Sequence, residues 1–219
     1  MKLPFTTEQF LDVFQRYNES VWPMQIVLVL LAIVAVILAL RFRPLSSKLI
    51  SATLTFFWLW MGILYHVLDF AIINPAAYAF GMLCILQGAI FLYAGWARQS
   101  LSFRYRSDVY GLTGLLLILY ALLVYPVLGY FLGHVYPKSP TFGLPCPTTI
   151  FTFGILLWTE KKVPLYVLII PFVWSLIGFS AALTLGIRED TGLLVAGVVS
   201  STMIIIRNKR QSRDKQEAG

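Results

Sequence analysis

The chain contains 219 residues, of which 58% are hydrophobic and 12% are charged. Soluble domains are usually about half apolar and about a quarter charged, so this composition excludes a soluble globular domain. Seven apolar stretches of about 20 residues each would occupy about 140 residues, which leaves loops and tails but no further domain. The net charge of +7 is the second unusual feature, and its meaning depends on where the basic residues lie.

Uninterrupted apolar runs predict the fold class, an all-α integral membrane helical bundle with seven transmembrane helices. They form a single membrane domain over residues 1–206, followed by a basic tail, residues 207–219, that we expect to be disordered. The expected spans are residues 23–40, 49–68, 78–97, 109–132, 143–158, 164–185 and 191–206.

A short amphipathic surface helix is expected before the first span. The first 20 residues carry several charges and lack the apolar centre of a signal peptide, so we expect no cleavable leader here. Thr6 and Gln9 have the spacing of a capping box, and Phe5 and Phe10 have that of a hydrophobic staple. Packing on the mouth of the bundle is a simpler role for this helix than membrane sensing or partner binding.

The basic residues predict the orientation of the bundle. Thirteen of the 17 Lys and Arg residues fall in the first, third and fifth loops and the tail, and four fall on the opposite side. Basic loops stay in the cytoplasm, so the C-terminus is expected there and the N-terminus outside. Because topology accounts for the positive charge, we expect a lipid bilayer as partner and no nucleic acid. The oligomeric state does not follow from the sequence.

The interior of the predicted bundle is poor in polar groups. Ionisable residues at mid-membrane depth usually mark an ion or proton path, and the predicted spans contain none there. Gln87 is the strongly polar residue at that depth and a candidate ligand-binding residue. It also fits the simpler role of hydrogen bonding between helices. We therefore do not expect a charge-coupled pump.

Candidate site residues gather at the outer face of the predicted bundle. His66 and Asp69 end the second span, His134 ends the fourth and Cys146 begins the fifth. Because Asp69 follows His66 by three residues, its carboxylate is expected to orient the imidazole. His66, His134 and Cys146 together would suit a metal such as zinc or copper. Alternatively, all are interface residues satisfied by water and backbone, since the two histidines form no ligand motif.

The segment of residues 134–149 contains four prolines and interrupts the fifth span. A regular helix is expected only over residues 147–158, about 18 Å long, whereas a membrane core is about 30 Å thick. Residues 143–146 should therefore line a polar cavity as irregular backbone, unless the short span simply packs against its neighbours. Thr148 and Thr149 begin that helix and offer hydroxyl and free N–H groups to an anion or polar ligand.

Three parts of the chain look familiar: LPFTTEQF with YNESVWP, INPAAYAFG with Gln87, and GHVYPKSPTFGLPCPTTIFTFG. Together they resemble a bacterial family of small multi-spanning inner-membrane proteins catalogued as a domain of unknown function. The resemblance extends over nearly the full chain and implies a bacterial inner membrane. It brings no established activity, cofactor or catalytic residue with it.

The sequence leaves three functions open. The first is a non-enzymatic membrane protein with an outward-facing polar pocket for a small ligand or a metal ion. The second is a permease for a small solute, which bent helices favour and the lack of mid-membrane charges opposes. The third is an intramembrane enzyme that uses His66, His134 and Cys146 as metal ligands, or as a thiol and base pair. No known catalytic motif supports it, and no cofactor is indicated.

Overall fold

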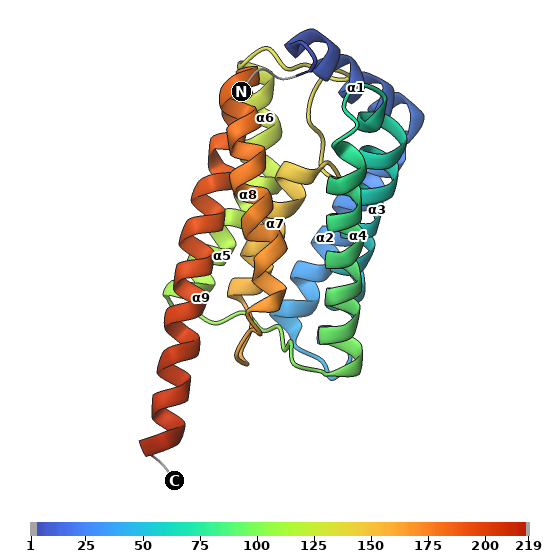
Figure 1. Ribbon diagram of the computed structural model, residues 1–219. Coiled ribbons are helices and arrows are strands. Elements are labelled where there is room, and N and C mark those ends of the chain that lie inside the picture. Colours follow the sequence, from blue (N-terminus) through green and yellow to red (C-terminus); the bar gives the residue numbers. More distant parts are fainter. Residues whose placement is uncertain (1–3, 218–219) are drawn as a thin grey trace.

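The computed structural model describes residues 4–217 as a bundle of helices lying roughly side by side (Figure 1). Residues 1–3 and 218–219, which entered the sequence predictions, lie outside this range. Helix α1 (Thr7–Ser20) lies across one end of the bundle, and the last turns of α9 (Thr191–Glu217) project from the other. We call these the α1 end and the tail end.

Six helical segments are long and apolar enough to cross a membrane, rather than the seven predicted. The segment that falls short is α7 (Pro145–Leu157), whose 13 residues extend only about 20 Å at 1.5 Å per residue. The six long segments are α2 (Met24–Arg41); α3 (Ser46–Trp60) with η1 (Met61–Asp69) and η2 (Phe70–Ile72); α4 (Ala77–Leu92) with η3 (Tyr93–Ala97); α5 (Val109–Leu119) with η4 (Tyr120–Val124) and α6 (Tyr125–Phe131); α8 (Tyr166–Leu185); and η5 (Arg188–Asp190) with α9.

Helix α7 still carries the chain from the α1 end to the tail end. Before it, the Asn18 side chain of α1 donates hydrogen bonds to the carbonyls of Pro137 and Ser139. After it, the Trp158 indole donates to the Gly111 carbonyl at the start of α5, 2.9 Å away. All residues of α7 except the half-buried Cys146 are buried, with α5, α8 and α9 packed around it. Irregular backbone at membrane depth needs such protein cover, so a short central helix is admissible.

The start of α7 differs from the prediction. The helix begins at Pro145, and only Gly143 and Leu144 of residues 143–146 lie outside it. Proline is compatible with the first turn of a helix because the N–H groups there have no intrahelical partner. Gly143 has a φ of +104°, a conformation that favours glycine, and makes the turn into the helix.

Helix α1 confirms the predicted cap and staple. The Gln9 N–H donates to Thr6 Oγ1 (3.2 Å), and the Thr6 N–H donates to Gln9 Oε1 (2.8 Å). The rings of Phe5 and Phe10 stack with centroids 5.8 Å apart. The buried face of α1 packs against η1, so this helix closes the mouth of the bundle.

The outside of the bundle carries many exposed apolar side chains. Soluble monomers rarely expose contiguous apolar surface on this scale, whereas a lipid-embedded bundle does. The belt is spread over the long helices and includes Leu30, Met82, Leu116, Leu123, Ile169, Leu183 and Val195.

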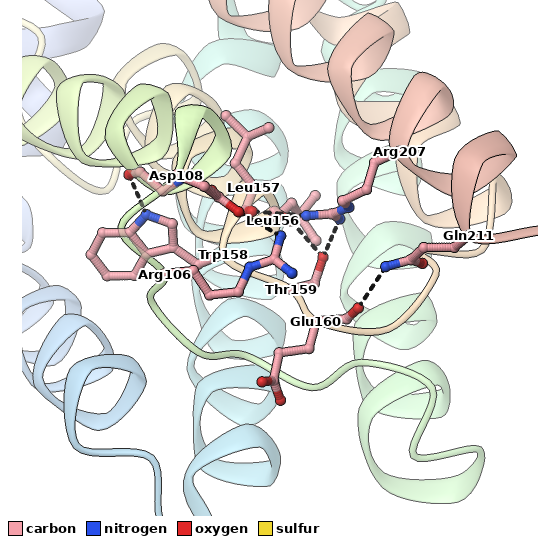
Figure 2. Close-up of polar contacts among 10 residues, drawn as sticks. Arg106, Asp108, Leu156, Leu157, Trp158, Thr159, Glu160, Arg207 and Gln211 are labelled. Carbon is pink, nitrogen blue, oxygen red and sulfur yellow. Dashed lines mark hydrogen bonds and ion pairs between the residues drawn. The ribbon is translucent and has the colours of Figure 1, made fainter. Parts of the chain in front are cut away.

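The tail that we expected to be disordered is helical. Helix α9 continues through it to Glu217. Asn208 Nδ2 donates to the Val163 carbonyl (2.7 Å), and Gln211 Nε2 donates to the Glu160 carbonyl (3.0 Å), as Figure 2 shows for Gln211. These bonds to the loop after α7 fix a segment whose composition alone indicates disorder.

Arg207 joins α9 to the end of α7 (Figure 2). Its guanidinium donates to the Leu157 carbonyl (2.9 Å) and to Thr159 Oγ1 (2.6 Å), and it lies over the Tyr110 ring. Leu157 is the last residue of α7, so Arg207 satisfies a carbonyl that has no partner within the helix. The side chain is only 4% exposed.

Replacing Arg207 with methionine is expected to lower the free energy of unfolding by about 2 kcal/mol or more. Hydrogen bonds from a charged donor contribute about 1.5–3 kcal/mol each, and the desolvation cost of the buried charge offsets part of this. Equilibrium unfolding in detergent measures the change. The exposed Arg210→Met is the control, expected within about 0.5 kcal/mol of wild type. Equal values for both variants would contradict a stabilising role for Arg207.

Candidate functional site

A cavity of about 500 Å³ lies among α1, η1, the start of α7 and α8, toward the α1 end. We call it the aromatic cavity. Its volume falls within the range of about 300–1,000 Å³ that is typical of small-molecule sites. The wall is largely apolar, which favours a ligand that is itself mostly apolar. The rings that line it are Phe5, Phe10, Phe14, Tyr65, Phe70, Phe80, Tyr125 and Trp174.

Three elements bring reactive side chains to this cavity: η1 supplies His66, the first turn of α7 supplies Cys146, and η5 supplies Asp190. Asp190 Oδ1 accepts a hydrogen bond from the Tyr125 hydroxyl at 2.5 Å. Because η5 leads directly into α9, the carboxylate also lies at the positive end of that helix dipole. The polar part of the wall is thus assembled from distant parts of the chain.

His66 has free hydrogen-bonding capacity. Its side chain is fully buried, yet neither ring nitrogen has a partner among the described residues. The ring packs edge-on against Trp174, with centroids 5.0 Å apart. The Trp174 indole N–H also lacks a partner within residues 4–217. Buried polar groups are normally satisfied, so these groups at one cavity indicate a place for a polar ligand group.

Asp69 does not orient His66 as predicted. Its Oδ1 instead accepts from Arg16 Nε of α1 at 2.6 Å. The physical reason is local: η1 is a π-helix, whose wider turns remove the alignment that residues three apart have on an α-helix. The Arg16–Asp69 ion pair therefore fastens α1 to the bundle.

His134 is also engaged away from His66. Its Nδ1 lies 2.6 Å from Oε1 of Glu189, which is fully buried. Among residues 4–217, no group of three or more His, Cys, Asp or Glu side chains could hold a metal ion. His66 and Cys146 line the aromatic cavity and His134 does not, so the predicted three-ligand metal site does not form.

The other three candidates lie outside the cavity wall. Thr148 Oγ1 accepts from the Gly143 N–H (3.1 Å) and so closes the turn before α7. Gln87 Nε2 donates to the Val167 carbonyl (3.0 Å) and joins α4 to α8. Thr149 Oγ1 is buried and has no partner among the residues described. For Gln87 and Thr148, these contacts indicate a structural role rather than ligand binding.

A buried tyrosine of α1, Tyr17, packs edge-on against Tyr65 of the cavity wall, with ring centroids 5.8 Å apart. Tyr17 Oη accepts from the Trp60 indole N–H at 2.7 Å. Burial raises the pKa of the Tyr17 hydroxyl above its usual value, so the group stays neutral. It therefore anchors α1 through packing and hydrogen bonding rather than through charge.

The sequence reasoning did not select Tyr125, Trp174 or Asp190. Tyr125 and Trp174 lie within apolar runs, where an aromatic residue is indistinguishable from ordinary core or lipid-facing positions. Asp190 did offer a signal, because Glu189 and Asp190 form an acidic pair in the last predicted outer loop. Two adjacent carboxylates in a short loop of an otherwise apolar chain are therefore the sequence signal that indicates Asp190 as a candidate site residue.

The architecture defines a class: an apolar, all-α bundle with six helices suited to crossing a membrane and a ligand-sized cavity near one end. The chain belongs to the DUF6064 family, described as a family of unknown function, whose model matches residues 7–215. The predicted membership of a family of unknown function is thereby confirmed. No curated protein and no solved structure matches the chain. The geometry of the site is therefore what indicates a function for this chain.

Proposed function

We propose that the protein binds a small, mostly apolar molecule with one uncharged hydrogen-bonding group in the aromatic cavity. The observation that carries the proposal is that buried His66 lines this cavity with both ring nitrogens unpartnered among the described residues. A hydroxyl, carbonyl or amide of the ligand would bond to His66 and to the Trp174 N–H after these rings turn toward the cavity, because their nitrogen atoms are covered in this structure. The aromatic wall would bury the remainder.

A catalytic role has less support. A thiol and base pair requires a hydrogen bond between nucleophile and base, and His66 makes none to Cys146. Transport is distinguishable from binding by counterflow of the bound molecule in proteoliposomes. We expect no counterflow, because the closely packed α7 lies between the cavity and the tail end.

The polar group of the ligand is the feature to test. 2-Naphthol should bind the purified protein in detergent at least about fivefold more tightly than naphthalene, because one hydrogen bond contributes about 1 kcal/mol net. The preference should be lost in His66→Phe and kept in His134→Gln, which alters a histidine outside the cavity. Fluorescence titration gives both dissociation constants. Equal affinity for both probes in the wild-type protein, or an intact preference in His66→Phe, would contradict the proposal.

We also propose a bacterial inner membrane as the location, with the α1 end outside and the tail end in the cytoplasm. The basic residues of the odd loops and the tail support this orientation. Alkaline phosphatase fused to the C-terminus should be inactive, and the same enzyme inserted after Pro75, at the α1 end, should be active. The reverse pattern would place the aromatic cavity on the cytoplasmic side.

A further inference from the structure

A second, smaller hollow of about 150 Å³ opens at the tail end. Three connections form its wall: the one from α2 to α3 with Arg43, the segment after η3 with Gln99, and the one from α7 to α8 with Lys161. Its volume equals that of about five water molecules at about 30 Å³ each. The hollow therefore suits a small polar group rather than a drug-sized molecule.

The wall of this hollow is cationic. Arg43, Lys48 and Lys161 line it, and none of them forms an ion pair with any residue that the structure describes. Lys161 Nζ donates to the Gln99 carbonyl (3.1 Å), and Lys48 Nζ lies 5.7 Å from the centroid of the Trp96 ring. Both contacts hold an ammonium group in place without neutralising it.

The carboxylate nearest in contact with the wall is that of Glu160, which bonds to the lining residue Ser102 without lining the hollow itself. Glu160 Oε2 accepts from Ser102 Oγ at 3.3 Å, and Glu160 Oε1 accepts from Arg104 at 3.4 Å. No Asp or Glu lines the hollow within residues 4–217. Arg104 therefore offsets Glu160, and the three lining cations keep their charge for a ligand.

The backbone around this hollow is strained. Phe42 and Gln99 both line it, with φ values of 34° and 48°, and they are the non-glycine residues with positive φ in the described chain. Such conformations tend to persist at binding sites, where the surrounding structure holds them. The hollow also lies where α2 ends and α3 begins, the level at which lipid headgroups meet a membrane-spanning bundle.

We propose that this hollow binds an anionic phosphate group, carried by an anionic phospholipid or by free phosphate. The Arg43 guanidinium can donate two parallel hydrogen bonds to phosphate oxygens, and Lys48 and Lys161 add point charges. Surface cations near an inner leaflet attract anionic lipid in general, whereas this hollow defines one place for the headgroup. The site is independent of the aromatic cavity, which lies at the other end of the bundle.

The test measures binding to the full-length protein in a zwitterionic detergent. Two of the ligands are short-chain phosphatidylglycerol and short-chain phosphatidylcholine. The third is sodium phosphate, compared with sodium chloride at equal ionic strength. Binding of each ligand is measured by the shift in the Tm of the protein. We expect the double variant Arg43→Gln/Lys161→Gln to raise the Kd of the active anion at least tenfold. The control Arg210→Gln/Arg213→Gln removes the same charge from an exposed face of α9, and its Kd should stay within twofold of wild type.

The ligand arms identify the source of the phosphate. A Tm shift with phosphatidylglycerol alone assigns a lipid headgroup, and a shift with sodium phosphate assigns the free ion; either supports the site. The proposed site would be overturned by no Tm shift with either anion, or by an equal Tm shift with both lipids. An equal increase in Kd in the two double variants would also overturn it. Both substituted side chains are exposed, so the Tm without ligand should not change. Lys161→Gln alone is the substitute if the double variant does not fold.

Discussion

Replacing Asn18 with alanine is expected to lower the free energy of unfolding by about 2–4 kcal/mol. The fully buried Asn18 side chain donates to the carbonyls of Pro137 (2.7 Å) and Ser139 (2.8 Å), and accepts from Thr141 Oγ1 (2.7 Å). Each such bond contributes about 0.5–1.5 kcal/mol net, and carbonyls left buried without a donor add to the loss. This one side chain therefore fastens three residues of the proline-rich connection to α1.

Equilibrium unfolding in detergent measures this change. Glu19→Ala is the control, because Glu19 is the exposed neighbour of Asn18, and its effect should stay within about 0.5 kcal/mol. Asn18→Ala should also weaken the binding of 2-naphthol, since Pro140 and Leu144 of the released connection line the aromatic cavity. An unfolding free energy equal to that of Glu19→Ala would show that the connection is held by other contacts.

Local patterns in the sequence predicted the local structure correctly. The spacing of Thr6 and Gln9 specified a capping box, and that of Phe5 and Phe10 specified a staple, because each pair lies within about one and a half turns at the start of a single helix. The prolines likewise predicted that the fifth span would be too short to cross a membrane as a helix. These properties depend on a few neighbouring residues.

The site depended on contacts that local patterns do not contain. Arg16 pairs with Asp69, which is 53 positions away in the sequence, and Glu189 pairs with His134, which is 55 positions away. The π-helical turn of η1 also changes which residues share a face with His66. With one sequence, neither the partner of an ionisable side chain nor a π-helical insertion can be read from spacing. The sequence was sufficient to place these polar residues at one end of the bundle. It was not sufficient to predict which of their side chains pair with one another.

Replacing Ala181 with tryptophan is expected to lower the affinity for 2-naphthol by about 100-fold or more. Ala181 lies on α8 and lines the aromatic cavity, so the indole would occupy the space that the naphthyl rings need. An aromatic system of this size buries about 150–250 Å², which corresponds to about 4–6 kcal/mol at about 25 cal/mol per Å². Loss of about two thirds of that contact corresponds to about 2.7–4 kcal/mol, which reaches the roughly 2.7 kcal/mol that a 100-fold change requires.

Leu183→Trp on the same helix is the matched control, because Leu183 is 68% exposed on the outside of the bundle. It adds an indole of the same kind without entering the cavity, so its dissociation constant should stay within about twofold of wild type. The free energy of unfolding of Ala181→Trp should not fall, since the new side chain fills an existing hollow rather than displacing packed atoms. If Ala181→Trp binds 2-naphthol as the wild-type protein does, the probe occupies the lipid-facing surface and the aromatic cavity is not its site.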